Sequence, residues 1–174
     1  YYDVDLSRYE DFYKLPTHNV YAIVLLAAQI PSYMEGYQPR KYIDSNIVGA
    51  FNVCEYARRV KADRILYTTT VFDISLSAKN GDVLKPDLPK NFSYKGDHAL
   101  YVITKNTAIE LLEHYHQEYG IKKFVFRLPT IYSYSPYQYY HPNGIKTMRP
   151  IYKMIEKAKK GETLEIWGDP NYST

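Results

Sequence analysis

Tyr101 and Lys105 stand four residues apart in a stretch whose apolar residues recur at helical spacing. On a helix, this separation places both side chains on one face. A nearby ammonium favours the charged form of a phenol, so we expect Lys105 to lower the pKa of Tyr101 toward neutral pH. Such a tyrosine can serve as general acid and base toward a hydroxyl group. Because the chain has 21 tyrosines, chance could also supply this spacing.

Further small and polar residues lie at the ends of two predicted strands. Thr68, Thr69 and Thr70 end a β-rich run over residues 64–70, and Ala27 and Ala28 follow an apolar run over 20–26. At the end of a strand, hydroxyls can face a ligand and small residues allow a ligand to approach closely. The alternatives are that threonine simply favours strands and that alanine serves tight packing.

These residues need a scaffold of alternating strands and helices. The predicted strands cover residues 20–26, 64–70, 123–128 and 164–167, and the predicted helices cover 41–60, 97–119 and 148–160. The continuous apolar run at 20–26 predicts a strand buried on both faces of a parallel sheet. Alternation of this kind predicts an α/β fold with a doubly wound parallel sheet. The aperiodic segment 75–95 is a predicted loop at the carboxyl ends of the strands, where ligands bind in such folds.

Composition excludes several classes of protein. The 174 residues carry a net charge of +3, which is weak for a nucleic-acid binder, and the longest apolar run is too short to span a membrane. The only cysteine, Cys54, lies in an apolar helical pattern, which indicates a buried structural thiol and fits a cytoplasmic protein. The histidines and carboxylates form no metal-ligand motif, so no metal is expected.

Taken in order, the motifs resemble a known family. The chain carries Leu25-Leu-Ala-Ala28, Asn46-Ile-Val-Gly-Ala-Phe-Asn52, Thr68-Thr-Thr70, Tyr101-Val-Ile-Thr-Lys105 and Arg127-Leu-Pro-Thr-Ile-Tyr132. This series is similar to that of extended short-chain dehydrogenase/reductases of the NAD-dependent epimerase/dehydratase group, with UDP-glucose 4-epimerase as the nearest type. The resemblance covers nearly the whole chain and implies a partial Rossmann-type sheet followed by the start of a small substrate-binding region.

The resemblance implies a catalytic set and a cofactor. Tyr101 would be the general base and acid, Lys105 would hold the nicotinamide ribose, and Thr70 would bind the reacting sugar oxygen. The cofactor would be NAD, with NADP not excluded. The residues implied to contact it are Asp5, Leu6, Ala27, Ala28, Thr68, Tyr101, Lys105 and Pro129. Asp5 would lie at the adenine, although a turn or helix-capping aspartate is an equal reading.

A nucleotide sugar, with UDP-hexose first, is the implied substrate. Its contacts would come from Thr70, Thr130, Glu165 and Trp167, with Trp167 stacking on the base; a half-buried aromatic is the alternative. Asn46 is assigned a structural role. Residues 1–135 would form part of the dinucleotide-binding domain and 136–174 part of the substrate region. The helices at 41–60 and 97–119 would pair two copies into a homodimer.

Departures from the family pattern limit the expected activity. None of the 8 glycines forms the family's glycine-rich pyrophosphate turn, and the chain opens at Tyr1. We therefore expect a fragment that by itself binds dinucleotide poorly. Val71 and Phe72 replace the Asp-Glu pair of sugar 4,6-dehydratases, which favours 4-epimerisation, an isomerase reaction. A reductase or dehydrogenase of the same family and a non-catalytic association fragment are the alternatives.

Overall fold

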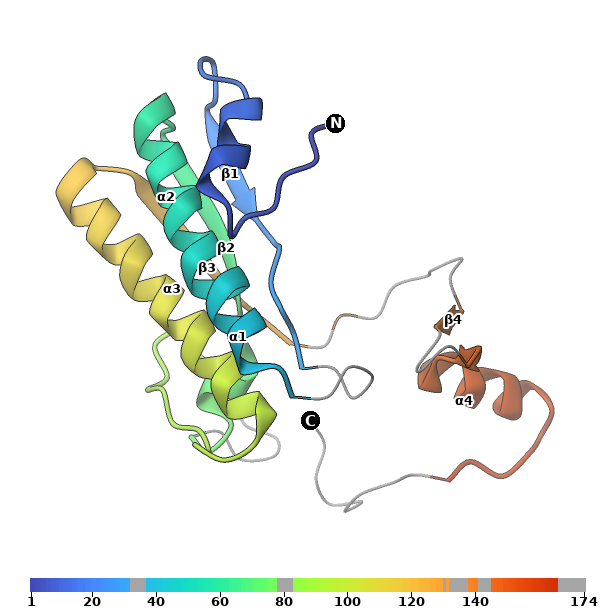
Figure 1. Ribbon diagram of the computed structural model, residues 1–174. Coiled ribbons are helices and arrows are strands. Elements are labelled where there is room, and N and C mark those ends of the chain that lie inside the picture. The colour runs from blue at the N-terminus through green and yellow to red at the C-terminus, as the bar shows by residue number, and fades with distance from the viewer. Residues whose placement is uncertain (32–36, 78–82, 130, 132–137, 141–144, 166–174) are drawn as a thin grey trace.

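Three parallel strands form the centre of the molecule (Figure 1). The structure, a computed structural model, describes residues 1–31, 37–77, 83–129, 131, 138–140 and 145–165. Strands β1 (Ala22–Leu25), β2 (Arg64–Thr70) and β3 (Lys122–Leu128) lie in the order β1-β2-β3. Leu25 pairs with Tyr67, and Thr70 pairs with Leu128. The carboxyl ends of the strands therefore meet at one edge, and the predicted parallel α/β fold is confirmed.

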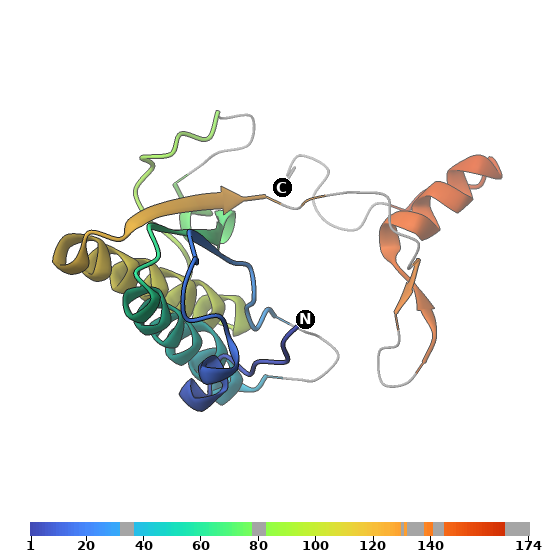
Figure 2. The ribbon, with the colours of Figure 1, turned by 90° about the horizontal axis from the view of Figure 1, so that it is seen from above.

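The helices α2 (Gly49–Val60) and α3 (Asp97–Tyr119) cover one face of this sheet (Figure 2). On the other face, Val24 of β1 is 58% exposed, and Leu26 just beyond the strand is 64% exposed. The prediction that this strand is buried on both faces is therefore wrong for the described residues. β1 is the edge strand, and no described helix packs on its second face.

The predicted helix 41–60 begins slightly earlier and has three parts. They are α1 (Pro39–Tyr42), the π-helical segment η2 (Ile43–Val48) and α2 (Gly49–Val60). Pro39 suits the first helical turn because proline has no N–H to leave unpaired there. Gly49 lets the N-terminal segment approach, since a β-carbon at Gly49 would lie only 3.0 Å from Cβ of Leu6.

The long helix α3 (Asp97–Tyr119) matches its predicted range. It ends at Gly120, which has the left-handed backbone that glycine adopts without strain, with φ 71°. Its buried positions include Val102, Lys105, Ala108, Leu112 and Tyr115, at the three- and four-residue spacing of one helix face. A lysine thus occupies a core position on this helix.

The main core lies between the helices and the sheet. Phe12 of the short 3-10 helix η1 (Tyr9–Lys14) packs there with Val53, Ile65 and Leu112. Cys54 is also buried in this core, and burial raises the pKa of its thiol to about 12. The thiol is therefore a packing group, as predicted.

The C-terminal part lies to one side of the helix–sheet unit (Figures 1 and 2). Strands β4 (Tyr139–Tyr140) and β5 (Thr147–Met148) pair antiparallel, and α4 (Pro150–Lys159) follows. The observed helix α4 is slightly shorter than the predicted range 148–160. Leu164 and Glu165 are not in a strand, contrary to prediction; the rest of that predicted strand lies outside the described residues. Among the described residues, no helix is long and apolar enough to cross a membrane.

Candidate active site

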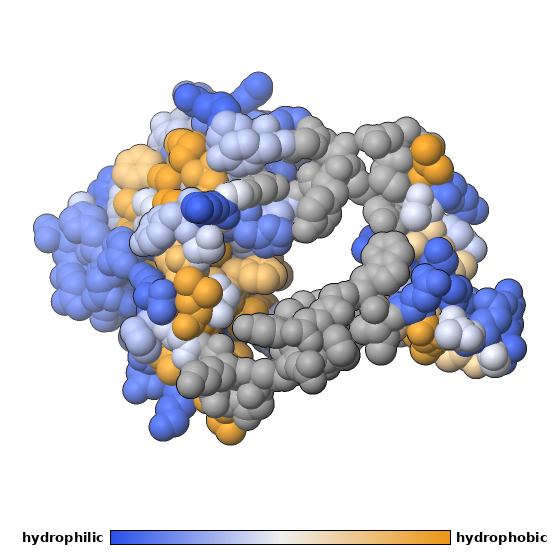
Figure 3. All heavy atoms as spheres, turned by 90° about the horizontal axis from the view of Figure 1, so that it is seen from below, coloured by the Kyte–Doolittle hydropathy of each residue, from blue (hydrophilic) through white to orange (hydrophobic). Residues whose placement is uncertain are grey.

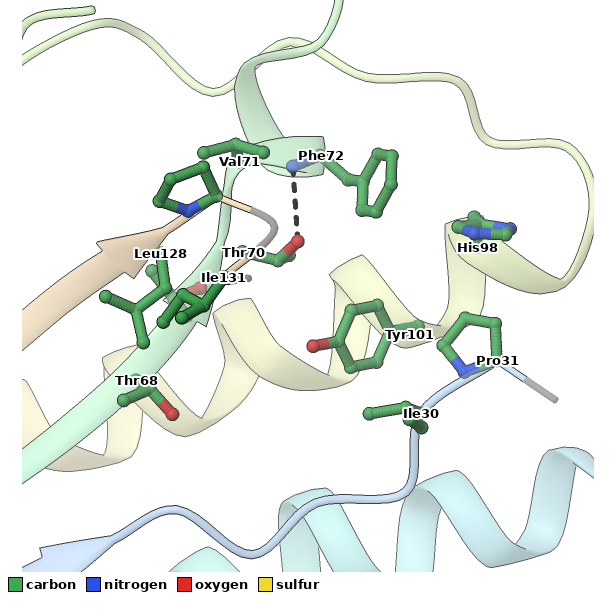
Figure 4. A pocket seen from close by; sticks show the side chains of 12 residues that line it. Ile30, Pro31, Thr68, Thr70, Val71, Phe72, His98, Tyr101, Leu128 and Ile131 are labelled. Atoms are coloured by element: carbon green, nitrogen blue, oxygen red, sulfur yellow. Dashed lines mark hydrogen bonds between the residues drawn. The ribbon is translucent and has the colours of Figure 1, made fainter. Parts of the chain in front are cut away.

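A cavity of about 460 Å³ opens where β2 and β3 end. Its lining includes Thr68, Thr70, Tyr101 and Pro129, which come from two strand ends and one helix. Figure 4 shows the hydroxyl of Tyr101 directed toward the threonines at the end of β2. Four of the residues predicted from separate motifs thus share one cavity, because parallel strands bring their carboxyl ends to the same edge.

Apolar side chains surround the polar centre of this cavity. Viewed from the side on which the strands end, apolar atoms are exposed on the helix–sheet unit (Figure 3). Ile30, Phe72 and Ile131 line the cavity and are exposed. Cavities that bind organic ligands usually combine such an apolar lining with a few placed polar groups.

Thr70 is held in place by its own backbone turn. It caps the short 3-10 helix η3 (Val71–Ile74), and its Oγ1 accepts a hydrogen bond of 3.3 Å from the Phe72 N–H. Thr70 is buried, and its hydroxyl lowers the pKa of Tyr101. The hydroxyl of Thr70 is therefore available to an oxygen placed beside Tyr101.

Burial has the larger effect on Tyr101. It raises the pKa of the phenol above the usual value, because the phenolate is the form that loses hydration. The net direction is opposite to the one expected from the Tyr-Lys spacing. The ammonium of Lys105 is not among the groups that shift this pKa; it lies over the ring of Tyr67, with Nζ 4.2 Å from the ring centroid.

Lys105 itself is 2% exposed. Burial lowers the pKa of its ammonium to about 8, since the charged form is poorly solvated inside the protein. Lys105 lies on the same face of α3 as Tyr101. Its side chain is buried, whereas that of Tyr101 is only half-buried.

Asn46 connects three elements around this lysine. Its side chain accepts a hydrogen bond of 2.7 Å from Gln29 N and donates bonds of 3.0 Å to Gln29 O and to Thr104 Oγ1. Thr104 in turn donates to the carbonyl of Tyr101. Asn46 thereby ties the segment after β1 to the turn of α3 between Tyr101 and Lys105. These contacts are those of a structural residue.

A second cavity, of about 370 Å³, contains the predicted adenine end of the site. Asp5, Leu6 and Ala27 line it together. The Asp5 carboxylate accepts hydrogen bonds from the Ser7 N–H and hydroxyl, and these lower its pKa. Asp5 therefore forms the turn that was the alternative reading, in a position open to a ligand. Ala28 is half-buried and lines neither of these two cavities.

Of the residues predicted to contact the substrate, Thr70 lines the first cavity. Thr130 and Trp167 lie outside the described residues, and Glu165 is exposed. Within the described part, no group of three or more His, Cys, Asp and Glu side chains could hold a metal ion.

Sequence reasoning missed two features of this site. His98 lines the first cavity, and its ring meets that of Phe72 edge-on at 5.0 Å. Its position three residues before Tyr101 on the same helix could have indicated it. Asp73 and Arg127 form a salt bridge behind the cavity; an Asp soon after Thr70 and an Arg ending the next strand are weak signals for that pairing.

The fold and these residues define a class of protein. The model of the "NAD dependent epimerase/dehydratase family" matches residues 1–173, and the chain belongs to this family. It is 26% identical over 171 residues to the UDP-glucuronate 4-epimerase of Thermodesulfobacterium geofontis, covering 97% of this chain and 48% of that protein. It is 31% identical over 134 residues to UDP-glucuronic acid decarboxylase 5 of Arabidopsis thaliana, covering 75% of this chain and 35% of that protein.

The fold has the same relatives. The crystal structure of UDP-glucuronic acid 4-epimerase from Bacillus cereus in complex with NAD matches with a TM-score of 0.62 at 20% identity. The match covers 96% of this chain and 46% of that one. The chain spans about half the length of curated relatives that it matches over 97% of its own length.

Proposed function

We propose that this chain carries the acid–base part of an NAD-dependent nucleotide-sugar epimerase, with 4-epimerisation as the reaction. One observation carries the proposal: the phenol of Tyr101 and the hydroxyl of Thr70 face the same cavity at the carboxyl edge of a parallel sheet. The family match supports it. NADP is the alternative cofactor.

Each member of the set has a distinct task. Tyr101 takes the proton of the sugar 4-hydroxyl and later returns it. Thr70 donates a hydrogen bond to the same oxygen and fixes it beside the phenol. Lys105, on the same helix, would hold the ribose hydroxyls of the dinucleotide. NAD bound beside these residues would supply reversible hydride transfer at the sugar carbon.

The residues at the strand ends fit the two ends of a dinucleotide, whereas the sequence has no glycine-rich pyrophosphate turn. Asp5 offers a carboxylate that can accept a hydrogen bond from an adenine amine, and Ala27 beside it leaves space for the ring. Leu6 supplies an apolar contact, and Thr68 and Pro129 line the end of the site nearer Tyr101. Ala28, next to Ala27, is the remaining residue that this proposal assigns to the cofactor.

The environment of Thr70 favours epimerisation over dehydration. Elimination of water needs an acid and a base beside the sugar, and the two residues after Thr70 are Val71 and Phe72. Both line the cavity as apolar groups. The substrate in this proposal is a UDP-hexose, with the nucleotide contacted by Glu165 and Trp167 and the sugar by Thr70 and Thr130.

The same proposal includes a domain boundary at residue 135, a cytoplasmic location and a homodimer. Phe51 on α2 is 44% exposed and Ile103 on α3 is 36% exposed. These apolar side chains lie on the two helices that would pair the copies.

The test uses the full-length protein with UDP-glucose, UDP-galactose and UDP-glucuronate as substrates. We expect Tyr101→Phe to reduce kcat by roughly 10²-fold or more, the usual contribution of a positioned acid–base group. Tyr119→Phe, on the exposed last turn of the same helix, is the matched control and should retain activity. Unimpaired turnover by Tyr101→Phe would overturn the assignment.

A reductase or dehydrogenase using the same residues gives a different result in this assay. Net accumulation of reduced cofactor, rather than interconversion of two sugars, would identify it. Dimerisation without dinucleotide binding by the full-length protein would indicate an association role alone.

A further inference from the structure

Tyr67 is a buried residue of β2, three positions before Thr70. It makes two contacts with Lys105. Nζ of the lysine lies 4.2 Å from the centroid of the Tyr67 ring, and the Tyr67 hydroxyl donates a hydrogen bond of 3.3 Å to the Lys105 carbonyl. One side chain thus contacts both the ammonium and the backbone of the lysine.

The buried ammonium depends on contacts of this kind. No charged partner offsets this burial among the causes of the Lys105 pKa shift in the described residues, and Nζ lies over the Tyr67 ring. The face of an aromatic ring is electron-rich and attracts a cation, and the attraction grows where water is excluded. The ring of Tyr67 therefore replaces part of the hydration that burial removes.

We propose that Tyr67 is a positioning residue, which keeps Lys105 charged and fixes it on the α3 face that carries Tyr101, through the face of its aromatic ring. Its consequence for catalysis rests on the proposed function; the contact itself does not. Tyr67 and Thr70 share β2, while Tyr101 and Lys105 share α3. One strand and one helix therefore set the positions of all four groups.

The ring and the hydroxyl of Tyr67 can be tested separately in the full-length protein. Tyr67→Phe removes the hydroxyl and keeps the ring face. Pentafluorophenylalanine introduced at position 67 keeps the shape of phenylalanine but makes the ring face electron-poor. Comparison of these two variants isolates the electrostatic contact and leaves the packing of the core nearly unchanged.

The first measurement is the pKa of Lys105. The titration is monitored by NMR of protein that is isotopically labelled at lysine Nζ. Besides Tyr67, the titratable group near this site is Tyr101, which both variants retain. We expect Tyr67→Phe to leave the lysine pKa unchanged. The fluorinated ring should lower it, because the electron-poor face disfavours the ammonium. Equal lysine pKa values in the two variants would overturn the proposal, and this measurement needs no turnover.

The second measurement is kcat/KM. We expect Tyr67→Phe to stay within about twofold of the parent protein and the fluorinated variant to lose about tenfold. In a Lys105→Met background, the fluorinated ring should cause no further loss, because a residue that acts through Lys105 has nothing left to act on. A loss in Tyr67→Phe as large as that of the fluorinated variant, or a further loss in the Lys105→Met background, would contradict the proposed role.

Discussion

The carboxylate of Asp73 holds the guanidinium of Arg127 through two hydrogen bonds, at 2.9 Å from Nε and 3.2 Å from Nη2. Asp73 is fully buried, and Arg127 also donates to the Pro86 carbonyl. Asp73 belongs to η3, directly after Thr70, and Arg127 lies on β3 near Pro129. This ion pair joins the ends of β2 and β3, which border the active-site cavity, and Arg127 also connects them to the loop at Pro86.

Asp73→Ala should destabilise the protein strongly, because it leaves the Arg127 guanidinium without its partner. We expect a loss of about 3 kcal/mol in the free energy of unfolding, measured by urea denaturation of the full-length protein. Arg40→Ala, which removes an exposed helix ion pair with Asp44, is the control and should change the free energy by less than about 0.5 kcal/mol. Similar losses in both variants would contradict the buried pair's role.

Asn46→Ala should loosen the segment after β1. The substitution leaves the N–H and carbonyl of Gln29 without their side-chain partner. We expect a loss of roughly 2 kcal/mol in the free energy of unfolding, with weaker NAD binding in fluorescence titration. Thr107→Ala, which removes an exposed bond to the Ile103 carbonyl, should have little effect on either. Full retention of NAD affinity by Asn46→Ala would show that NAD binding does not depend on the hydrogen bonds between Asn46 and the segment after β1.

Lys105 should make the stability of the protein depend on alkaline pH. The folded state lowers its pKa from 10.5 to about 8, so between these values the unfolded chain binds more protons. Stability should therefore rise with pH through this window, and the full penalty should be present below about pH 8.

Replacement of Lys105 tests this relation. Lys105→Met should raise the free energy of unfolding at pH 7 by up to about 3 kcal/mol, and the gain should vanish toward pH 10.5. Its kcat/KM should fall well below that of the parent protein while staying measurable. The exposed Lys95→Met is the control for the pH series. A gain that does not change with pH would mean that side-chain packing, not charge, is responsible.

The exposed apolar residues of the two helices should mediate the proposed homodimer. Phe51→Glu together with Ile103→Glu would place charges in the contact, and we expect the dimer to dissociate in sedimentation-velocity experiments. A double change to Glu at Val24 and Leu26, which are exposed on the other side of the sheet, is the control. Dissociation in the control alone would locate the interface on the sheet instead.

Most of the elements could be predicted from the sequence because their signals are local. The range of α3 follows from helical spacing and Gly120, and β2 follows from its β-rich run. The bounds of β1 and its exposure were less predictable. An apolar strand looks the same in a sequence whether or not a helix covers its second face. The cavity residues Thr70 and Tyr101 were predictable because strand ends and helix faces are also local properties.

The sequence by itself determined the order of strands and helices, the placement of Tyr101 and Lys105 on one helix face, and the motif series of the family. Only the tertiary structure decided which groups surround those side chains. Asp73 and Arg127 are 54 positions apart, and Tyr67 and Lys105 are 38 apart. The pKa of Tyr101 is raised rather than lowered because desolvation depends on everything that packs around a side chain, which spacing along one helix does not specify.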